Sequence, residues 1–423
     1  MTINSDRRKL MKAGLAATAM ITLPAYVTPT IGSQGPSVSQ VKMILAKLVE
    51  YQVPGAGIAF VENGRLAWEQ GFGAKNWTTG DPVTRQTLFQ AASLSKPAFA
   101  YVVMQAIDKN EIGLDDKLTK YLRPVDLKPH RWSEQITVRD VLQHTTGLQN
   151  WREDADGPDP LTPAFQPGTD STYSGEAFHW LQRVMEQITG LGLDAMMRER
   201  LFQPAGLEDM RMLWEPGRDS REVYGHKVDA EGAIIVDDLQ FIREHGPRLE
   251  EVAQRWGRPM NIWTAQDHVR AVASMRPHTH SRLKDRLAWR WGRPGAFIID
   301  SASSLRCTAG DYARFLCLMM PGRKRAPWEI TEQSRQAMLT PQFELEIEQG
   351  RLPRGFGWGL EKRDNGVAYY HWGKNGPSHI SVALGDATTR KAIVIMTNGS
   401  NGNALIKDLV TSLMGEEYIG IIT

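Results

Sequence analysis

The sequence predicts an α+β fold, an antiparallel β-sheet flanked by helices with an inserted all-helical region. Near the start, two β-rich runs flank Asn63-Gly64, the strongest short signal for a hairpin. Near the other end, VAYYHWGK, SHISVALGD and RKAIVIMTN are strand-like runs at hairpin spacing. The middle of the chain is mainly helical, with many Pro and Gly breaks. We therefore expect the sheet to come from 36–90 and 355–423, and the helical region to cover about 97–350.

The elements can be placed in order along the chain. A short helix is expected near 38–50, before the first hairpin, and an amphipathic helix is expected over about 93–110. The run at 392–397 is continuously apolar, so it should be central in the sheet, and a helix follows over about 401–415. Residues 228–295 are irregular and rich in Trp, Arg and His, which is typical of a variable insertion.

Composition excludes several classes of protein. The chain has 423 residues, of which 41% are hydrophobic and 23% charged, as in globular proteins. Its net charge is +2, which gives no overall attraction to nucleic acid, although the segment RLKDRLAWRWGR mixes basic and aromatic residues. No run of 18 apolar residues is present, so no stable membrane span is expected. With two cysteines the chain has no disulfide scaffold, and we expect no metal and no organic cofactor.

The first residues are typical of an export signal. A basic head, DRRKLMK, precedes a mostly small and apolar run over 13–27 that is short for a membrane span. Arg7-Arg8 resembles the start of a twin-arginine signal. We therefore expect 1–35 to be signal peptide and linker, either cleaved or kept as an anchor. The domain at 36–423 is expected to act in the periplasm or outside the cell.

Ser93-Leu94-Ser95-Lys96 stands where the first long amphipathic helix begins. One helical turn places Lys96 on the same face as Ser93. A serine hydroxyl is a weak nucleophile that needs a base beside it, and a neutral lysine can serve. The start of a helix also aims backbone N–H groups at a developing oxyanion. Ser-x-x-Lys also occurs often by chance, and without further support a helix cap with an exposed lysine would be the favoured explanation.

Two further segments support the catalytic interpretation. Tyr173 precedes another amphipathic helix, and a tyrosine beside a lysine can share its proton and pass it to a leaving group. His371-Trp372-Gly373 ends a strand, where Gly373 would let a substrate backbone approach closely. Each has a plain structural explanation, a packed aromatic and a β-turn. Three such segments in this order are harder to explain that way.

Together these segments resemble the serine β-lactamase and penicillin-binding-protein superfamily, on the branch of class C β-lactamases, carboxypeptidases and esterases. The matching stretches, spread over 53–399, include VPGAGIAFVENG, TLFQAASLSKP, ITVRDVLQHTTGL, QPGTDSTYSG, GFGWGL and HWGKNG. The resemblance implies that Ser93 is the acylated nucleophile and that Lys96 and Tyr173 move its proton. It implies that backbone N–H groups of Ser93 and Lys374 hold the oxyanion, in a site between the sheet and the helical region.

The chain departs from the family pattern at two positions. The family's Tyr-x-Asn is here Tyr173-Ser174-Gly175, so an amide that contacts a peptide or β-lactam carbonyl is missing, at a typical cost of about 1–3 kcal/mol. His371 replaces the Lys of Lys-Thr-Gly and resembles the His-x-Gly of carboxypeptidase-like relatives, where a protonated ring would hold a carboxylate. The two departures point to different substrates. His144, in HTTGL, is interpreted as structural.

The sequence therefore predicts an exported serine hydrolase that forms an acyl-Ser93 intermediate. The substrate is an ester first, then a D-amino-acid peptide or a β-lactam, and an alcohol or amine in place of water would make the protein an acyltransferase. The alternative is a penicillin- or cell-wall-peptide-binding or sensing protein that is acylated without turnover. Gly175 keeps this alternative open. The intact set of Ser93, Lys96 and Tyr173 argues against it.

Overall fold

The computed structural model describes residues 35–152, 160–237, 240–274, 298–347, 350–364 and 366–422. These residues belong to one of the chain's two units, Gly32–Thr423. The predicted export signal and the basic, aromatic segment at 282–293 lie outside the described residues, so both interpretations stay predictions. In the described ranges, none of the helices combines the length and the apolar character needed to cross a membrane.

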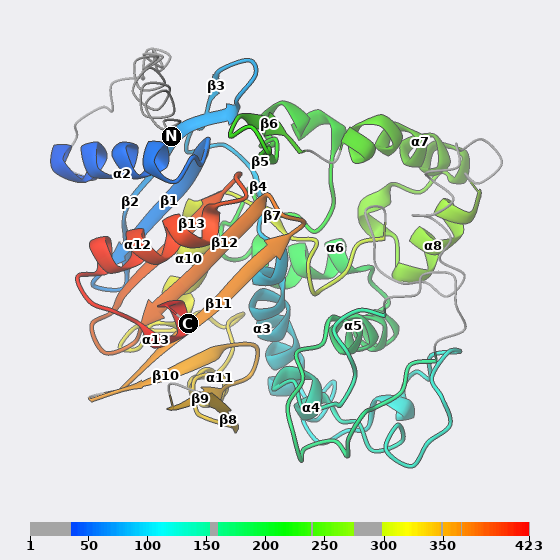
Figure 1. The fold of residues 1–423 in the computed structure, drawn as a ribbon. Helices are drawn as coiled ribbons and strands as arrows, with labels where there is room; N and C mark the ends of the chain where they lie inside the picture. Colours follow the sequence, from blue (N-terminus) through cyan, green and yellow to red (C-terminus); the bar gives the residue numbers. More distant parts are fainter. Residues whose placement is uncertain are drawn as a thin grey trace, which may run out of the picture. The chain divides into compact units, whose positions relative to one another are not determined.

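Nine antiparallel strands form the main sheet of the described residues, in the order β3-β2-β1-β13-β12-β11-β10-β9-β8 (Figure 1). Its strands are β1 (Gly55–Glu62), β2 (Arg65–Asn76), β3 (Asp81–Pro82), β8 (Phe343–Ile347), β9 (Gly350–Arg354), β10 (Gly359–Arg363), β11 (Gly366–Asn375), β12 (His379–Asp386) and β13 (Lys391–Thr397). Two small sheets pair β4 (Phe89–Gln90) with β7 (Arg306–Cys307), and β5 (His226–Val228) with β6 (Ile234–Val236).

The predicted α+β architecture is confirmed, and both terminal parts of the chain contribute to the sheet. Asn63 and Gly64 join β1 to β2 with positive φ angles of 54° and 73°, the backbone that a two-residue hairpin turn requires. The apolar run at 392–397 lies in β13, which pairs with β1 on one side and β12 on the other. It is therefore an interior strand, as its sequence predicts.

The sheet extends further than the sequence indicated on its C-terminal side. Residues 343–350 were expected in the helical region and 351–354 were assigned to neither part, but together they form the hairpin β8–β9 at the edge of the sheet. The segment FELEIEQGRLPR alternates apolar and charged residues only briefly, and Pro353 interrupts the pattern. Pro353 lies in β9, between β10 and the edge strand β8, and a proline in the sequence argues against a strand that has neighbours on both sides. The correction matters because β9 ends at Arg354.

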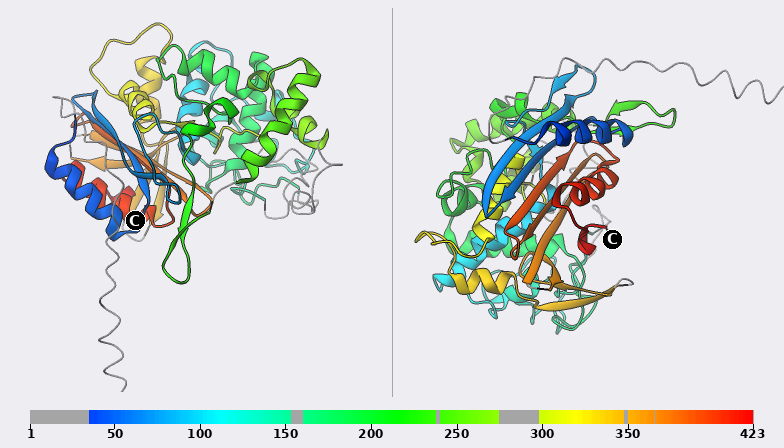
Figure 2. Two further views of the ribbon diagram at one scale, coloured as in Figure 1. Left: turned by 90° about the horizontal axis from the view of Figure 1, so that it is seen from above. Right: turned by 90° about the vertical axis from the view of Figure 1, so that its left-hand side faces the viewer.

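Helices cover both faces of the sheet. The helices are α2 (Val38–Glu50), α3 (Ser95–Asp108), α4 (Val138–Leu142), α5 (Gly175–Thr189), α6 (Leu193–Met197), α7 (Gln240–Trp256), α8 (Ala265–Ser274), α10 (Ala309–Met319), α11 (Glu332–Met338), α12 (Gly402–Met414) and α13 (Ile419–Ile422). Shorter helical turns are η1 (Ala92–Leu94), η2 (Leu118–Lys120), η3 (Arg198–Phe202), η4 (Pro216–Arg221) and η5 (Met260–Ile262). Figure 2 shows α2 and α12 lying across one face of the sheet.

The alternation along β13 explains how the sheet joins two cores. Ile393 and Ile395 belong to the core beneath α2 and α12. Val394 and Met396, on the opposite face, belong to the larger core that includes α3, α5 and α10. The sheet is thus buried on both sides. Its second face carries the helices on which the candidate site is built.

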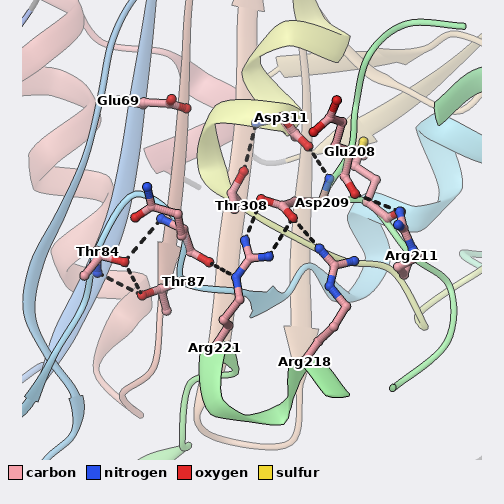
Figure 3. Close-up of polar contacts among 12 residues, drawn as sticks. Glu69, Thr84, Thr87, Glu208, Asp209, Arg211, Arg218, Arg221, Thr308 and Asp311 are labelled. Carbon is pink, nitrogen blue, oxygen red and sulfur yellow. Dashed lines mark hydrogen bonds and ion pairs between the residues drawn. The ribbon is translucent and has the colours of Figure 1, made fainter. Parts of the chain in front are cut away.

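A charged cluster ties the helical region to α10. Arg218 and Arg221, from η4, both pair with Asp209, and an Arg221 Nη1–Asp209 Oδ1 bond measures 2.9 Å (Figure 3). The backbone N–H of Asp209 donates to Asp311 Oδ2 at 2.7 Å. Thr308 caps α10, since its Oγ1 accepts from the Asp311 N–H at 3.1 Å. These contacts fix α10 against the segment that follows the π-turn η3.

Candidate active site

Ser93 lies in the turn η1, immediately before α3, and its side chain is half-buried. The preceding residue, Ala92, has a φ of +51°, which is unusual for a residue with a side chain. Backbone strain of this kind persists only where the surroundings hold it. Ser93 is thus presented from a constrained turn at the start of a buried helix.

The surroundings of this turn supply that constraint. The Ser95 hydroxyl donates to Ala92 O at 2.6 Å and accepts from the Leu305 N–H at 2.9 Å. The Tyr312 hydroxyl donates to Leu94 O at 2.8 Å, and all these groups are buried. The turn is therefore held from both sides by groups more than 200 positions away in the sequence.

Lys96 is 1% exposed and reaches Ser93. Its Nζ donates to Ser93 Oγ at 3.2 Å and to Ala302 O at 3.0 Å. Nζ also lies 4.5 Å from the centre of the Tyr173 ring. No carboxylate pairs with Lys96 among the described residues. The amine, the hydroxyl and the phenol predicted from the sequence are thus in one place.

Tyr173 stands two residues before α5 and packs between two histidines. Its ring centre is 4.4 Å from that of His144 and 6.0 Å from that of His371. Its hydroxyl is buried and has no hydrogen-bond partner among the described residues. A buried hydroxyl without a partner is costly and indicates a site that substrate or water completes.

His144 positions Tyr173. It is 3% exposed with a φ of +63°, and its Nδ1 accepts from the Ser174 N–H at 3.1 Å. Since Nδ1 accepts, the ring proton lies on Nε2, which is buried without a partner among the described residues. Burial, with Arg354 and Lys96 nearby, holds the pKa of His144 well below its usual range. A neutral ring stacked on Tyr173 fits the structural interpretation.

His371, in β11, is also neutral. It is 5% exposed, and its Nδ1 lies 2.6 Å from Trp372 O, which can only accept, so Nδ1–H is the donor. Burial first, and then the charge of Lys96, lowers the pKa of His371 from 6.5 to about 3. A neutral ring cannot hold a carboxylate by charge. It offers Nε2, buried and without a partner in the described ranges, as an acceptor beside Tyr173.

A cavity of about 540 Å³ opens over these groups. It is lined by Ser93, Asn150, Tyr173, Arg354, Tyr370, His371, Trp372, Lys374 and Gly376. Two of these residues are cations and none is acidic. In the part of the chain that the structure describes, no group of three or more His, Cys, Asp or Glu is arranged to hold a metal ion.

Gly373 and Gly175 were predicted to contact substrate, but neither lines the cavity. A Cβ at Gly373 would lie 2.3 Å from Ala91 O, so this glycine lets β11 pack against the nucleophile turn. A Cβ at Gly175 would lie 2.3 Å from Cζ2 of Trp151. Both glycines permit close packing within the protein, and their contact with substrate stays a prediction. Lys374, one residue on, is exposed and does line the cavity.

Sequence reasoning missed two residues of the cavity. Arg354, at the end of β9, is half-buried and has no acidic partner among the described residues. No sequence signal marked it, because residues 351–354 were assigned neither to the helical region nor to the sheet. Asn150 follows the HTTGL segment, and its Oδ1 accepts from the Gly175 N–H at 2.9 Å. Only its nearness to a family segment could have drawn attention to it.

Comparison with known proteins gives one consistent result. The family described as Beta-lactamase matches residues 41–409. Penicillin-binding protein 4 of Amycolatopsis lactamdurans is 27% identical over 385 residues, covering 87% of this chain and 86% of that protein. Esterase EstB of Burkholderia gladioli is 28% identical over 190 residues, covering 38% of this chain and 48% of that protein. The octameric penicillin-binding protein homologue from Pyrococcus abyssi has a TM-score of 0.66 at 17% identity, over 90% of this chain and 78% of that one, a likeness of fold alone.

Proposed function

The chain belongs to the β-lactamase family of serine hydrolases, and we propose that it cleaves carboxylic esters through an acyl-enzyme formed on Ser93. The observation that carries the proposal is the 3.2 Å contact between Lys96 Nζ and Ser93 Oγ inside the cavity that Tyr173 also lines. A nucleophile within hydrogen-bond reach of its base is the signature of covalent catalysis.

The reaction follows from the positions of these groups. Ser93 Oγ attacks the ester carbonyl while its proton passes to the Lys96–Tyr173 pair. The carbonyl oxygen becomes an oxyanion, and backbone N–H groups of Ser93 and Lys374 are proposed to bind it. The pair returns the proton to the departing alkoxide, which leaves as alcohol. Water then adds to the acyl carbon and gives its proton to the same pair, which passes it to Ser93 Oγ as the acyl–Oγ bond breaks and the acid is released.

Two features support esters as the substrate. An alkoxide is an easier leaving group than the amide nitrogen of a peptide. The relative named esterase EstB is consistent with this choice. Arg354 and Lys374 give the cavity a positive potential, which favours neutral or anionic esters over cationic ones.

We also propose that the protein acts outside the cytoplasm. The basic head with Arg7-Arg8 and the apolar run at 13–27 support export through a twin-arginine route. Replacing both arginines by lysine should keep the chain in the cytoplasm of its host. Unchanged export of that variant would contradict the twin-arginine route.

Hydrolysis of a short-chain nitrophenyl ester by the purified protein tests the activity, with Ser93→Ala beside it. We expect sustained turnover in the parent and a loss of at least about a thousandfold in the variant. Equal turnover in both would overturn the Ser93 mechanism. Release of a single equivalent of nitrophenol, with no further turnover, would favour the alternative of a binding or sensing protein.

A further inference from the structure

The Tyr173 motif lacks its amide, yet the cavity contains one from another loop. We propose that Asn150 Nδ2 donates a hydrogen bond to a second carbonyl of the substrate, carried on the acyl side of the scissile ester. The substrate class would then be esters of N-acylated amino acids or short peptides. This inference rests on the proposed function, because it describes the acyl group that Ser93 takes up.

The first support is that position 175 cannot hold the missing side chain. A Cβ built there would lie 2.3 Å from Trp151 Cζ2 and 2.6 Å from two more atoms of the same indole. Real Cβ atoms do not approach other atoms so closely, and a ring packed at the start of α5 cannot move aside cheaply. Trp151 therefore occupies the space that an asparagine would need, and Gly175 is a consequence of that packing.

The second support is the orientation of Asn150. Its Oδ1 accepts from the Gly175 N–H at 2.9 Å, and its backbone O accepts from the N–H groups of Gly175 and Glu176 at 3.1 and 3.0 Å. A backbone N–H can pair only with the oxygen of the amide, so the orientation of the side chain is determined. Nδ2 is then the free end. It has no partner among the described residues, and Asn150 lines the cavity beside Tyr173.

The third support is that this loop is anchored. The next residues, Trp151 and Arg152, turn inward, and Arg152 Nε donates to Glu176 Oε1 at 2.8 Å with both side chains buried. Arg152 also pairs with Asp126. Asn150 is itself exposed, at the rim of the cavity, but its backbone is fixed on both sides. A donor held in place before binding loses little entropy when substrate arrives.

The acyl side follows from the order of events. The alcohol leaves after acylation, whereas the acyl group stays on Ser93 until water releases it. A contact to the acyl group therefore stabilises both halves of the reaction, and a contact to the alcohol stabilises only the first. A fixed donor beside Tyr173, which acts in both halves, matches the acyl group.

The test compares two esters with acyl chains of equal length, 4-nitrophenyl N-acetylglycinate and 4-nitrophenyl pentanoate, which differ in that an amide CO–NH replaces CH2–CH2. Rates with Ser93→Ala are subtracted as background. Asn150→Ala removes the donor, and Asn150→Asp removes it while keeping an oxygen for the Gly175 N–H. We expect the ratio of kcat/KM values, N-acetylglycinate over pentanoate, to fall about five- to tenfold in both variants, as for one lost hydrogen bond. Gln149→Ala, an exposed neighbouring amide outside the cavity lining, should leave the ratio unchanged.

The outcomes separate the two proposals. An unchanged ratio in both Asn150 variants, with Ser93-dependent hydrolysis intact, overturns the inference and leaves the esterase standing. An equal fall for both esters also overturns it, because Asn150 would then only hold the start of α5. Hydrolysis that does not depend on Ser93 refutes the proposed function itself. Thermal unfolding of each variant shows whether a loss of activity is caused by misfolding. If Asn150→Ala is misfolded, the ratio measured with Asn150→Asp tests the inference.

Discussion

The two walls of the cavity are built differently. On the wall that carries Ser93, the turn is braced by Ser95 and Tyr312, whose hydroxyls are fully engaged with backbone groups. The facing wall consists of the contacting rings of Tyr173, His144 and His371, of which Tyr173 and His371 line the cavity. The Tyr173 hydroxyl and the Nε2 atoms of the two histidines are buried with no partner among the described residues. The hydroxyls of Ser95 and Tyr312 thus have their hydrogen bonds without substrate, whereas the facing wall keeps donors and acceptors that substrate can pair with.

This difference separates two tasks that a hydrolase must perform. A nucleophile has to be held in a strained position, which requires a surplus of native contacts around it. Groups that pass protons and meet developing charge need free donors and acceptors, which cost stability until substrate arrives. Substitutions on the two walls should therefore differ in whether they lower stability or activity.

The largest effect is expected at Lys96, which contacts Ser93 on one wall and the Tyr173 ring on the other. Lys96→Met keeps the volume of the side chain and removes the amine that contacts Ser93 Oγ. We expect kcat/KM for a nitrophenyl ester to fall about a thousandfold, in the range seen for lost general-base catalysis. Stability should change little, because the buried amine without a carboxylate partner in the described ranges is removed while the buried Ala302 O loses its donor. Activity near the parent value would contradict the proposed role of the base.

Tyr173→Phe tests the facing wall by itself. Because the hydroxyl it removes has no partner among the described residues, the free energy of unfolding should be unchanged or slightly higher. The value of kcat/KM should nevertheless fall about a hundredfold, since proton transfer to the leaving group is lost. Tyr312→Phe is the matched control on the other wall. It leaves the buried Leu94 O unpaired and should lower the melting temperature.

Ser95→Ala tests the bracing of the nucleophile turn. The substitution leaves Ala92 O and the Leu305 N–H, both buried, without their partner. We expect a loss of about 2 kcal/mol in the free energy of unfolding, measured in urea. The value of kcat/KM should fall only to the extent that the loss of these hydrogen bonds lets the turn shift Ser93 away from Lys96. If stability were unchanged and activity collapsed, the division of tasks between the walls would be wrong.

The parts of this structure that the sequence predicted depend on local patterns. Asn63-Gly64 determines a hairpin by itself, and the unbroken apolar run at 392–397 indicates a buried strand. Ser93 and Lys96 are one helical turn apart, so their contact follows from helix geometry. In each case the physical cause lies within a few residues.

The parts that the sequence did not predict depend on contacts between distant segments. Arg354 reaches the cavity from the end of β9, a strand that the sequence did not predict because Pro353 interrupts its alternating pattern. Asn150 acquires its orientation from Gly175, 25 positions away. Gly175 looked like a missing amide, but its meaning became clear only when Trp151 was seen in the same space. A motif shows which side chain is absent and cannot show what has replaced it.

The smallest effect concerns the charge of the facing wall, where His371 has a pKa of about 3 in place of 6.5. Below pH 6.5 the unfolded chain binds a proton at His371 that the folded protein does not. Stability contributed by the neutral ring is therefore complete above pH 6.5 and is lost as the pH falls toward 3. His371→Asn cannot take up that proton, so its unfolding free energy should decline less than that of the parent between pH 6.5 and 4 in urea titrations. Parallel curves for the two proteins would mean that His371 titrates normally, and that the facing wall carries a cation where the structure indicates a neutral acceptor.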